Sequence, residues 1–97
     1  MDDSRWLFED PQNVAVLTTT NVVKHNTFVL YVSHDSDDGM WQFHDGADVD
    51  ENNAMLISLQ EMVELDPSIS ELADLPLGWI AWRRSTNESW NREKDPS

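Results

Sequence analysis

The 97-residue chain contains no cysteine. This absence excludes a disulfide framework, a thiolate zinc site and a thiol nucleophile, and it fits a reducing compartment. No apolar run approaches the roughly 18 residues that a membrane-spanning helix needs. The first residues also lack the basic and apolar regions of a secretion signal. We therefore expect a cytoplasmic protein without a membrane segment.

Basic residues are scarce: six Lys and Arg stand against nineteen Asp and Glu, which gives a formal net charge of −13. The interval between Lys24 and Arg83 contains no Lys or Arg. It holds twelve carboxylates: Asp35, Asp37, Asp38, Asp45, Asp48, Asp50, Glu51, Glu61, Glu64, Asp66, Glu71 and Asp74. A surface of one negative sign repels phosphate backbones and anionic lipid and attracts cationic partners. The charge argues against nucleic-acid and membrane binding, and it leaves two interpretations open, a surface for a basic protein or plain solubility.

Apolar residues are frequent enough for one core. The hydrophobic share is 39% and includes five Trp, and the length is that of one ordinary domain. We assign residues 1–12 to an N-terminal arm, 13–85 to a single domain and 86–97 to a polar C-terminal tail. No second domain or separate cofactor domain is expected.

Local patterns predict the elements of this domain. Runs rich in β-branched and aromatic residues predict strands within 13–23, 27–34, 40–44, 54–58 and 79–84, with a hairpin over 27–44. Ser58 and Glu61 have capping-box spacing, and Asp66 followed by Pro67 is typical of a helix start. The predicted fold class is α+β: a mostly antiparallel sheet of four to five strands, with two short helices between the penultimate and last strands.

The acidic stretch SHDSDDGMWQF, residues 33–43, is the first candidate for a metal loop. An EF-hand loop needs oxygen ligands at positions 1, 3 and 5, glycine at 6 and glutamate at 12. A loop that starts at Asp35 has Gly46 at position 12, and one that starts at Asp48 has Leu59 there. Neither acidic loop completes the pattern, so we expect no metal and no other cofactor.

Two histidines flank the bend of the predicted hairpin. If the bend is centred on Asp37, His34 pairs with Met40 and Leu30 pairs with His44. The two imidazoles then share a face but lie about 13 Å apart along it at the usual strand rise. This separation does not favour a transition-metal site.

Catalytic arrangements are also absent from the sequence pattern. Ser33 and His34 are adjacent in a strand, so their side chains point to opposite faces and make a poor nucleophile–base pair. The three glycines are isolated, so there is no phosphate loop. We expect a non-enzymatic protein.

The remaining interpretation divides the bend into a buried and an exposed half. Tyr31, Trp41 and Phe43 form a cross-strand cluster that holds the sheet. The exposed acidic residues of this loop and the next are candidates for partner binding: Asp35, Asp37, Asp38, Asp48, Asp50 and Glu51. The alternatives left open are an accessory domain without a steered partner and a small-ligand binder that uses an aromatic face.

Several features occur in a fixed order from residue 14 to residue 84. They are a Gly-x-Trp-x-Phe strand that begins at Gly39, a Ser-Leu run at Ser58, an Asp-Pro helix start at Asp66, and a Pro-x-Gly turn at Pro76 before a strand that ends at Arg83. In this order the chain resembles a family of small bacterial domains of unknown function related to immunity proteins of polymorphic toxin systems. The resemblance implies a non-enzymatic domain that neutralises a toxin-like, basic protein by binding it. It implies no binding residues and no oligomeric state.

Overall fold

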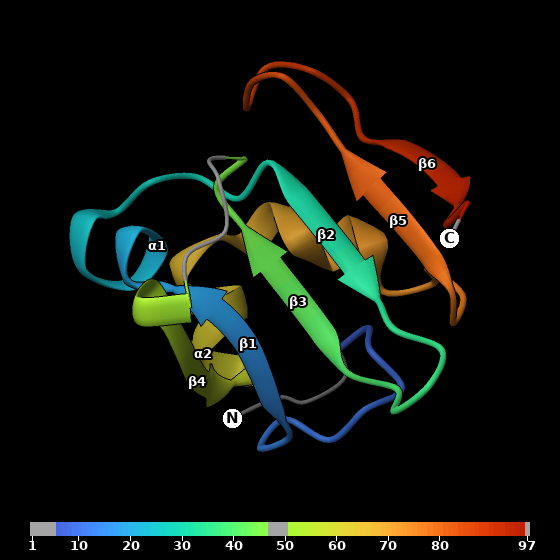
Figure 1. The fold of residues 1–97 in the computed structure, drawn as a ribbon, viewed down its shortest axis with the longest axis horizontal. Coiled ribbons are helices and arrows are strands. Elements are labelled where there is room, and N and C mark those ends of the chain that lie inside the picture. Colours follow the sequence, from blue (N-terminus) through green and yellow to red (C-terminus); the bar gives the residue numbers. More distant parts are fainter. Residues whose placement is uncertain (1–5, 47–50, 97) are drawn as a thin grey trace.

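One mixed β-sheet organises the computed structural model, which describes residues 6–46 and 51–96 (Figure 1). Its strands are β1 (Ala15–Thr19), β2 (Tyr31–His34), β3 (Trp41–His44), β4 (Ala54–Ser58), β5 (Trp79–Trp82) and β6 (Asn91–Lys94). Their order across the sheet is β4-β1-β3-β2-β5-β6. The helices are α1 (Thr20–His25) and α2 (Leu59–Leu65), with short 3₁₀ helices η2 (Glu51–Asn53) and η3 (Pro67–Leu72). None of these described helices combines the length and hydropathy needed to cross a membrane.

The α+β class is confirmed, but the predicted sheet was too small. Residues 91–94, which we had placed in a polar tail, form β6 and pair with β5. The sheet thus has six strands, and β1 pairs with β3 in parallel while the other pairings are antiparallel. The two helical segments α2 and η3 lie between β4 and β5, so they do not directly precede the last strand.

Helix α1 was not predicted, because residues 20–23 are rich in β-branched and polar types. Its two caps explain why a helix forms there. The Thr19 hydroxyl accepts a hydrogen bond from the Val22 amide at 3.3 Å, and Asn26 ends the helix in the left-handed conformation, with φ 55°. The Thr27 amide then closes the turn on the Asn21 carbonyl at 3.1 Å. Capping and the burial of Val22 outweigh the weak strand propensity.

The predicted starts of the next two helices are confirmed. The Ser58 hydroxyl accepts from the Glu61 amide at 3.1 Å, and the Asp66 carboxylate accepts from the Ser68 amide at 3.1 Å. Pro67 occupies the first helical turn, where its missing N–H costs no hydrogen bond. The second segment is nevertheless a 3₁₀ helix, which is common for such short pieces.

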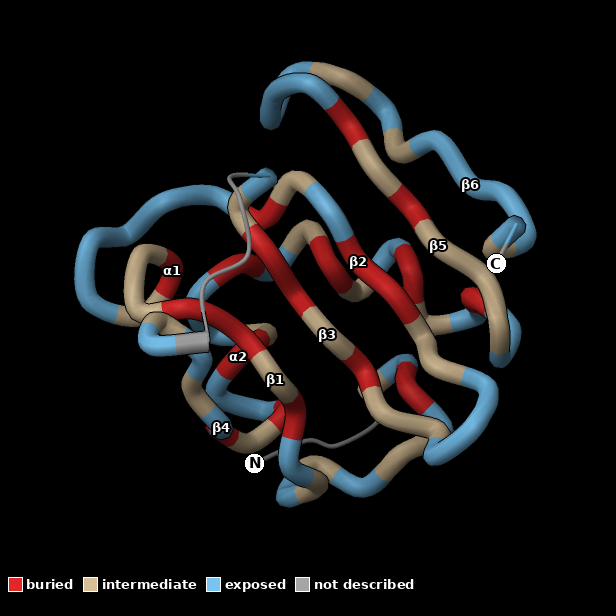
Figure 2. Tube along the Cα trace, viewed as in Figure 1, coloured by how far each residue is buried: buried red, intermediate tan, exposed pale blue. Residues whose placement is uncertain are grey.

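The core lies on the face of the sheet against which α2 and η3 pack (Figure 1), and buried segments run along β1, β2 and β3 (Figure 2). The N-terminal arm closes this side, because Phe8 is buried and meets the Trp41 ring edge-on at 5.3 Å. Residues 12 and 14 also satisfy the first amides of α2, since Leu59 donates to the Val14 carbonyl and Gln60 to the Gln12 carbonyl, each at 2.9 Å. The principal buried apolar side chains are Val16, Val22, Val29, Val32, Trp41, Phe43, Leu59, Met62, Ile69, Leu72, Leu75 and Ala81.

A buried ion pair joins elements that are distant in sequence. Arg83 follows β5, and its guanidinium lies 3.4 Å from the Asp66 carboxylate and 2.9 Å from both the Val29 carbonyl and the Ser68 hydroxyl. The same carboxylate accepts from the Val29 amide at 3.1 Å. Trp90 covers the guanidinium carbon at 4.1 Å from its ring centroid. This Arg83 cluster therefore ties the end of β5 and the start of η3 to the segment that enters β2.

The β2–β3 hairpin has a register one residue away from the predicted one. His34 pairs with Trp41 instead of Met40, and His44 pairs with Tyr31 instead of Leu30. The bend is closed by hydrogen bonds between the Asp35 amide and the Met40 carbonyl and between the Gly39 amide and the Asp35 carbonyl. Gly39 adopts φ 74°, which an L side chain rarely adopts. The bend is thus centred between residues 37 and 38.

This shift exchanges the side chains between the faces of the sheet, because side chains alternate along a strand. Trp41 lies on the core face, where it stacks on His34 at 3.9 Å between ring centroids. Tyr31 lies on the opposite face and is 36% exposed. The predicted Tyr31, Trp41 and Phe43 cluster is therefore wrong in one member. The prediction that the imidazoles of His34 and His44 share a face is also wrong.

Candidate functional site

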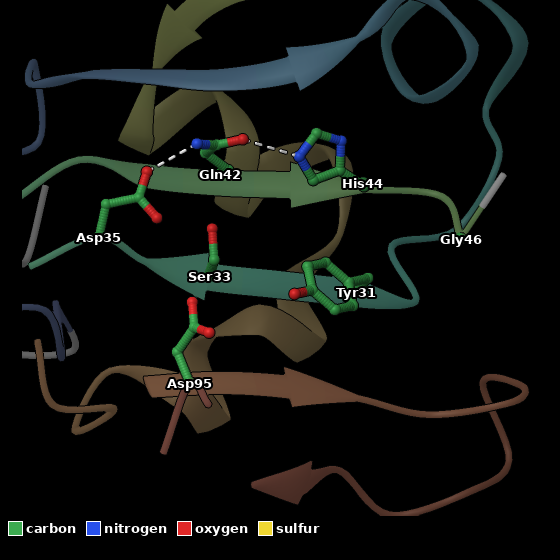
Figure 3. Close-up of a pocket in the computed structure, with 7 residues that line it drawn as sticks. All are labelled: Tyr31, Ser33, Asp35, Gln42, His44, Gly46 and Asp95. Carbon is green, nitrogen blue, oxygen red and sulfur yellow. Dashed lines mark hydrogen bonds between the residues drawn. The ribbon is translucent and has the colours of Figure 1, made fainter. Parts of the chain in front are cut away.

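The sheet face opposite α2 and η3 carries a concave site. The strand register places the side chains of Tyr31, Ser33, Gln42 and His44 there, with Trp82 of β5 paired directly to Tyr31. A pocket of about 400 Å³ opens on this face. Its lining residues are Tyr31, Ser33, Asp35, Gln42, His44, Gly46 and Asp95, and we call it the open-face pocket (Figure 3).

A chain of hydrogen bonds runs along one wall of the pocket. The Gln42 Nε2 donates to Asp35 Oδ2 at 2.6 Å, which fixes the amide so that its Oε1 faces His44 Nε2 at 3.0 Å (Figure 3). An amide oxygen only accepts, so the His44 proton lies on Nε2. One Nε2 proton of Gln42 and the Nε2 proton of His44 are therefore committed to internal bonds.

His44 is a neutral and deeply placed member of this wall. Only 6% of its surface is exposed. Burial lowers its pKa, and the nearby carboxylates of Asp45 and Asp35 only partly oppose this effect. Its Nδ1 is buried and has no hydrogen-bond partner among residues 6–46 and 51–96. The pocket wall thus contains a neutral imidazole with an unused acceptor nitrogen.

Carboxylates give the pocket a negative potential. Partial burial raises the pKa of the Tyr31 phenol, and the negative charges of Asp95, Asp35 and Glu93 raise this pKa further. Figure 3 shows Ser33 between Asp35 and Asp95, with the Tyr31 hydroxyl directed toward the same region. The pocket therefore combines hydroxyls and carboxylates at its centre.

The structure separates the residues that the sequence analysis had grouped. Asp35 lines the open-face pocket, whereas Asp37 and Asp38 are exposed on the bend. Asp38 Oδ1 accepts from the Met40 amide at 2.9 Å, which stabilises the bend itself. Asp37 lines a neighbouring hollow of about 380 Å³, whose lining also includes Asp35, Ser36, Leu77, Gly78, Lys94 and Asp95.

The second acidic loop contains the other three predicted partner-binding residues, Asp48, Asp50 and Glu51. Asp48 and Asp50 lie outside the residues that the structure describes, and Glu51 begins η2. Their proposed role in partner binding stays a prediction.

Sequence reasoning missed most of the pocket. Tyr31, Ser33, Gln42 and His44 alternate along β2 and β3, and the correct register alone would have grouped them. Asp95 follows β6, a strand that composition did not indicate. The alternation of polar and apolar residues in WQFH was the available signal, because Gln42 and His44 form its polar face.

The described pocket lining contains neither a metal-ligand cluster nor a paired serine and histidine. Within the described ranges, no group of three or more His, Asp or Glu side chains is arranged to hold a metal ion. His44 donates from Nε2 to Gln42, so this nitrogen does not activate the Ser33 hydroxyl. What the pocket offers is a set of carboxylates and hydroxyls beside an exposed aromatic ring.

Comparisons with known proteins add no relative. No protein family, no curated protein and no solved structure matches this chain.

Proposed function

We propose that this chain is a non-enzymatic binding domain whose acidic surface takes up a basic protein. The observation that carries the proposal is the open-face pocket: a concave site on a sheet face that no described helix covers, bounded by Asp35 and Asp95. With a net charge of −13, the surface attracts cationic partners over distances beyond direct contact. The resemblance to immunity-related domains suggests a toxin-like partner.

The bend gives this surface its protruding part. Asp37 and Asp38 are exposed, and they follow closely after Asp35, which lines the pocket. Exposed carboxylates of this kind contribute little to folding but raise the rate of encounter with a positive surface. A partner is therefore steered by the bend and held by the pocket.

The test is the association rate of a captured partner. Proteins retained from the native lysate by the wild-type chain are identified, purified and measured against a triple variant, Asp35→Asn with Asp37→Asn and Asp38→Asn. Its matched control carries Glu61→Gln, Glu64→Gln and Glu71→Gln, which remove the same charge from exposed positions on the helical side.

We expect the bend variant to associate several-fold more slowly than the control at low salt. The difference should shrink as salt screens the field, because the Debye length falls from about 30 Å at 0.01 M to about 8 Å at 0.15 M. Equal rates for the wild-type chain and the bend variant at low salt would contradict the proposal.

A further inference from the structure

Negative charge dominates the open-face pocket. Its described lining residues include two carboxylates, Asp35 and Asp95, and no Lys or Arg. The Nε2 proton of His44 and one Nε2 proton of Gln42 are committed to internal bonds. The second oxygen of Asp35 and the hydroxyls of Ser33 and Tyr31 face the pocket and can accept hydrogen bonds (Figure 3). A cationic donor ligand therefore complements this lining, whereas a phosphate or carboxylate ligand would meet negative charge.

His44 forms a neutral part of the same lining. The ring is 94% buried, and burial lowers its pKa, so it adds no positive charge that would oppose a cation. Its Nδ1 is itself shielded from solvent, so a ligand in the pocket does not reach this nitrogen. The carboxylates and hydroxyls of the lining are therefore the groups that meet a ligand.

Aromatic surface bounds the same pocket. The Tyr31 ring is 36% exposed, lies 6.2 Å from the His44 ring and pairs across the strands with Trp82. Planar cations stack on exposed aromatic faces, and the attraction grows where water is displaced. The shape of the site thus favours a flat cation over a compact one.

We propose that the open-face pocket binds the guanidinium group of an arginine side chain presented by the basic partner. A guanidinium has five donors and no acceptor, is always charged, and combines forked bonding to a carboxylate with stacking on aromatic rings. Asp35 supplies the carboxylate, Ser33 a further acceptor and Tyr31 the aromatic face. The assignment rests on the proposed function for the source of the arginine, but the pocket chemistry is testable without a partner.

The test uses short peptide probes and the intact chain. The peptide Ac-Gly-Arg-Gly-NH₂ is titrated while backbone and side-chain NMR signals are followed, and peptides with lysine or with neutral citrulline in place of arginine serve as comparisons. The variants are Asp35→Asn and Tyr31→Leu, and the matched charge control is Glu64→Gln on α2. A thermal melt of each variant establishes that it is folded.

We expect the arginine peptide to shift signals of Tyr31, Ser33, Gln42 and His44, with weaker binding of the lysine peptide and none of the citrulline peptide. Asp35→Asn should weaken arginine binding about tenfold, the usual effect of losing one charged hydrogen bond. Tyr31→Leu should weaken it severalfold, and Glu64→Gln should leave it nearly unchanged. Equal binding of citrulline or lysine, or an unchanged affinity in Asp35→Asn, would overturn the assignment.

The two proposals fail in different ways. If a purified partner binds the Asp35→Asn chain as tightly as the wild type, the proposed function stands and the arginine assignment falls. If the peptides behave as expected but no basic partner forms a complex, the arginine assignment stands and the proposed function falls.

Discussion

Trp41 and Tyr31 lie on neighbouring strands but serve opposite faces of the sheet. Trp41 is 2% exposed and contacts three rings, stacking on His34 and Phe43 and receiving the edge of Phe8. Tyr31 stands on the open face. The two aromatic residues of one hairpin therefore have different surroundings: Trp41 packs in the core, and Tyr31 lines the pocket.

This division predicts unequal effects on stability. Trp41→Ala should lower the free energy of unfolding by roughly 3–5 kcal/mol, because it removes a buried aromatic side chain and leaves a cavity. Tyr31→Leu should cost only about 1 kcal/mol, the usual size for a partly exposed position. Urea unfolding of both variants measures the difference. Similar losses for the two would show that the faces have been assigned incorrectly.

His44 predicts a pH dependence of a definite sign. Because burial lowers its pKa in the folded state, the unfolded chain takes up a proton more readily. The stability contributed by the neutral ring is complete above the unfolded pKa of about 6.5 and is lost as the pH falls from there toward the lowered folded pKa. Asp45 and Asp35 face the ring and limit the loss.

The measurement is the free energy of unfolding of the wild-type chain minus that of His44→Gln, from pH 8 down to pH 5. We expect this difference to fall below about pH 6.5. A difference that stays constant, or rises as the pH falls, would show that the ring is not held in its neutral form.

At the scale of the elements, the buried ion pair between Asp66 and Arg83 holds the start of η3 to the end of β5. Arg83 and Asp66 are 6% and 7% exposed, so neither charge is well solvated without the other. A buried ion pair is not by itself strong evidence of stability, but breaking it by removing one partner leaves an uncompensated charge. The Arg83 cluster therefore acts as a single unit.

Arg83→Met should lower the free energy of unfolding by roughly 3–5 kcal/mol, since Asp66 would remain buried without its cation. Arg92→Met is the control: Arg92 pairs with the exposed Asp74 at 2.6 Å, and surface pairs contribute little. Chemical denaturation of both variants gives the comparison. A small loss in Arg83→Met would mean that Asp66 is solvated or protonated in that variant.

The sequence predicted the elements better than their pairing. Ser58 and Asp66 indicated the helical starts through local hydrogen bonding, and the strand at 54–58 has the predicted bounds. The strand predicted over 79–84 ends two residues earlier, at Trp82. The hairpin register depended on the conformation of Gly39, which composition does not reveal, and one residue of error moved Tyr31 to the wrong face. The open-face pocket was missed for this reason.

Two other elements were missed for different physical reasons. Helix α1 depends on caps at Thr19 and Asn26 that outweigh β-branched propensity. Strand β6 is exposed at every residue, so it carries no hydrophobic alternation and is defined by pairing with β5 (Figure 2). Its position at the sheet edge was therefore visible only in three dimensions.

For the molecule as a whole, like charges oppose folding. A net charge of −13 on one small domain produces self-repulsion that is stronger in the compact state than in the extended chain. Salt screens this repulsion between exposed groups, whereas the buried Arg83 and Asp66 pair is screened much less.

We therefore expect the melting temperature to rise as NaCl increases from 10 mM to 150 mM. The increase should be smaller in the triple variant Asp35→Asn, Asp37→Asn and Asp38→Asn, because less negative charge remains to be screened. Calorimetry at matched pH, with KCl as a second salt, measures both effects. A fall in melting temperature over this salt range would mean that attractive pairs outweigh the repulsion.

The position of β1 inside the sheet affects how a newly made chain can fold. Both of its neighbours, β3 and β4, follow it in the sequence, and its parallel pairing with β3 requires β2 to be bypassed. During synthesis from the N-terminus, β1 therefore has no strand to pair with until residues 41–44 of β3 have left the ribosome, and its second partner β4 follows at residues 54–58. Such non-local pairings slow folding. We expect the domain to acquire its structure in one late step. Protection of the nascent chain by a chaperone would therefore matter most during the interval in which β1 has been made but its partner strands have not.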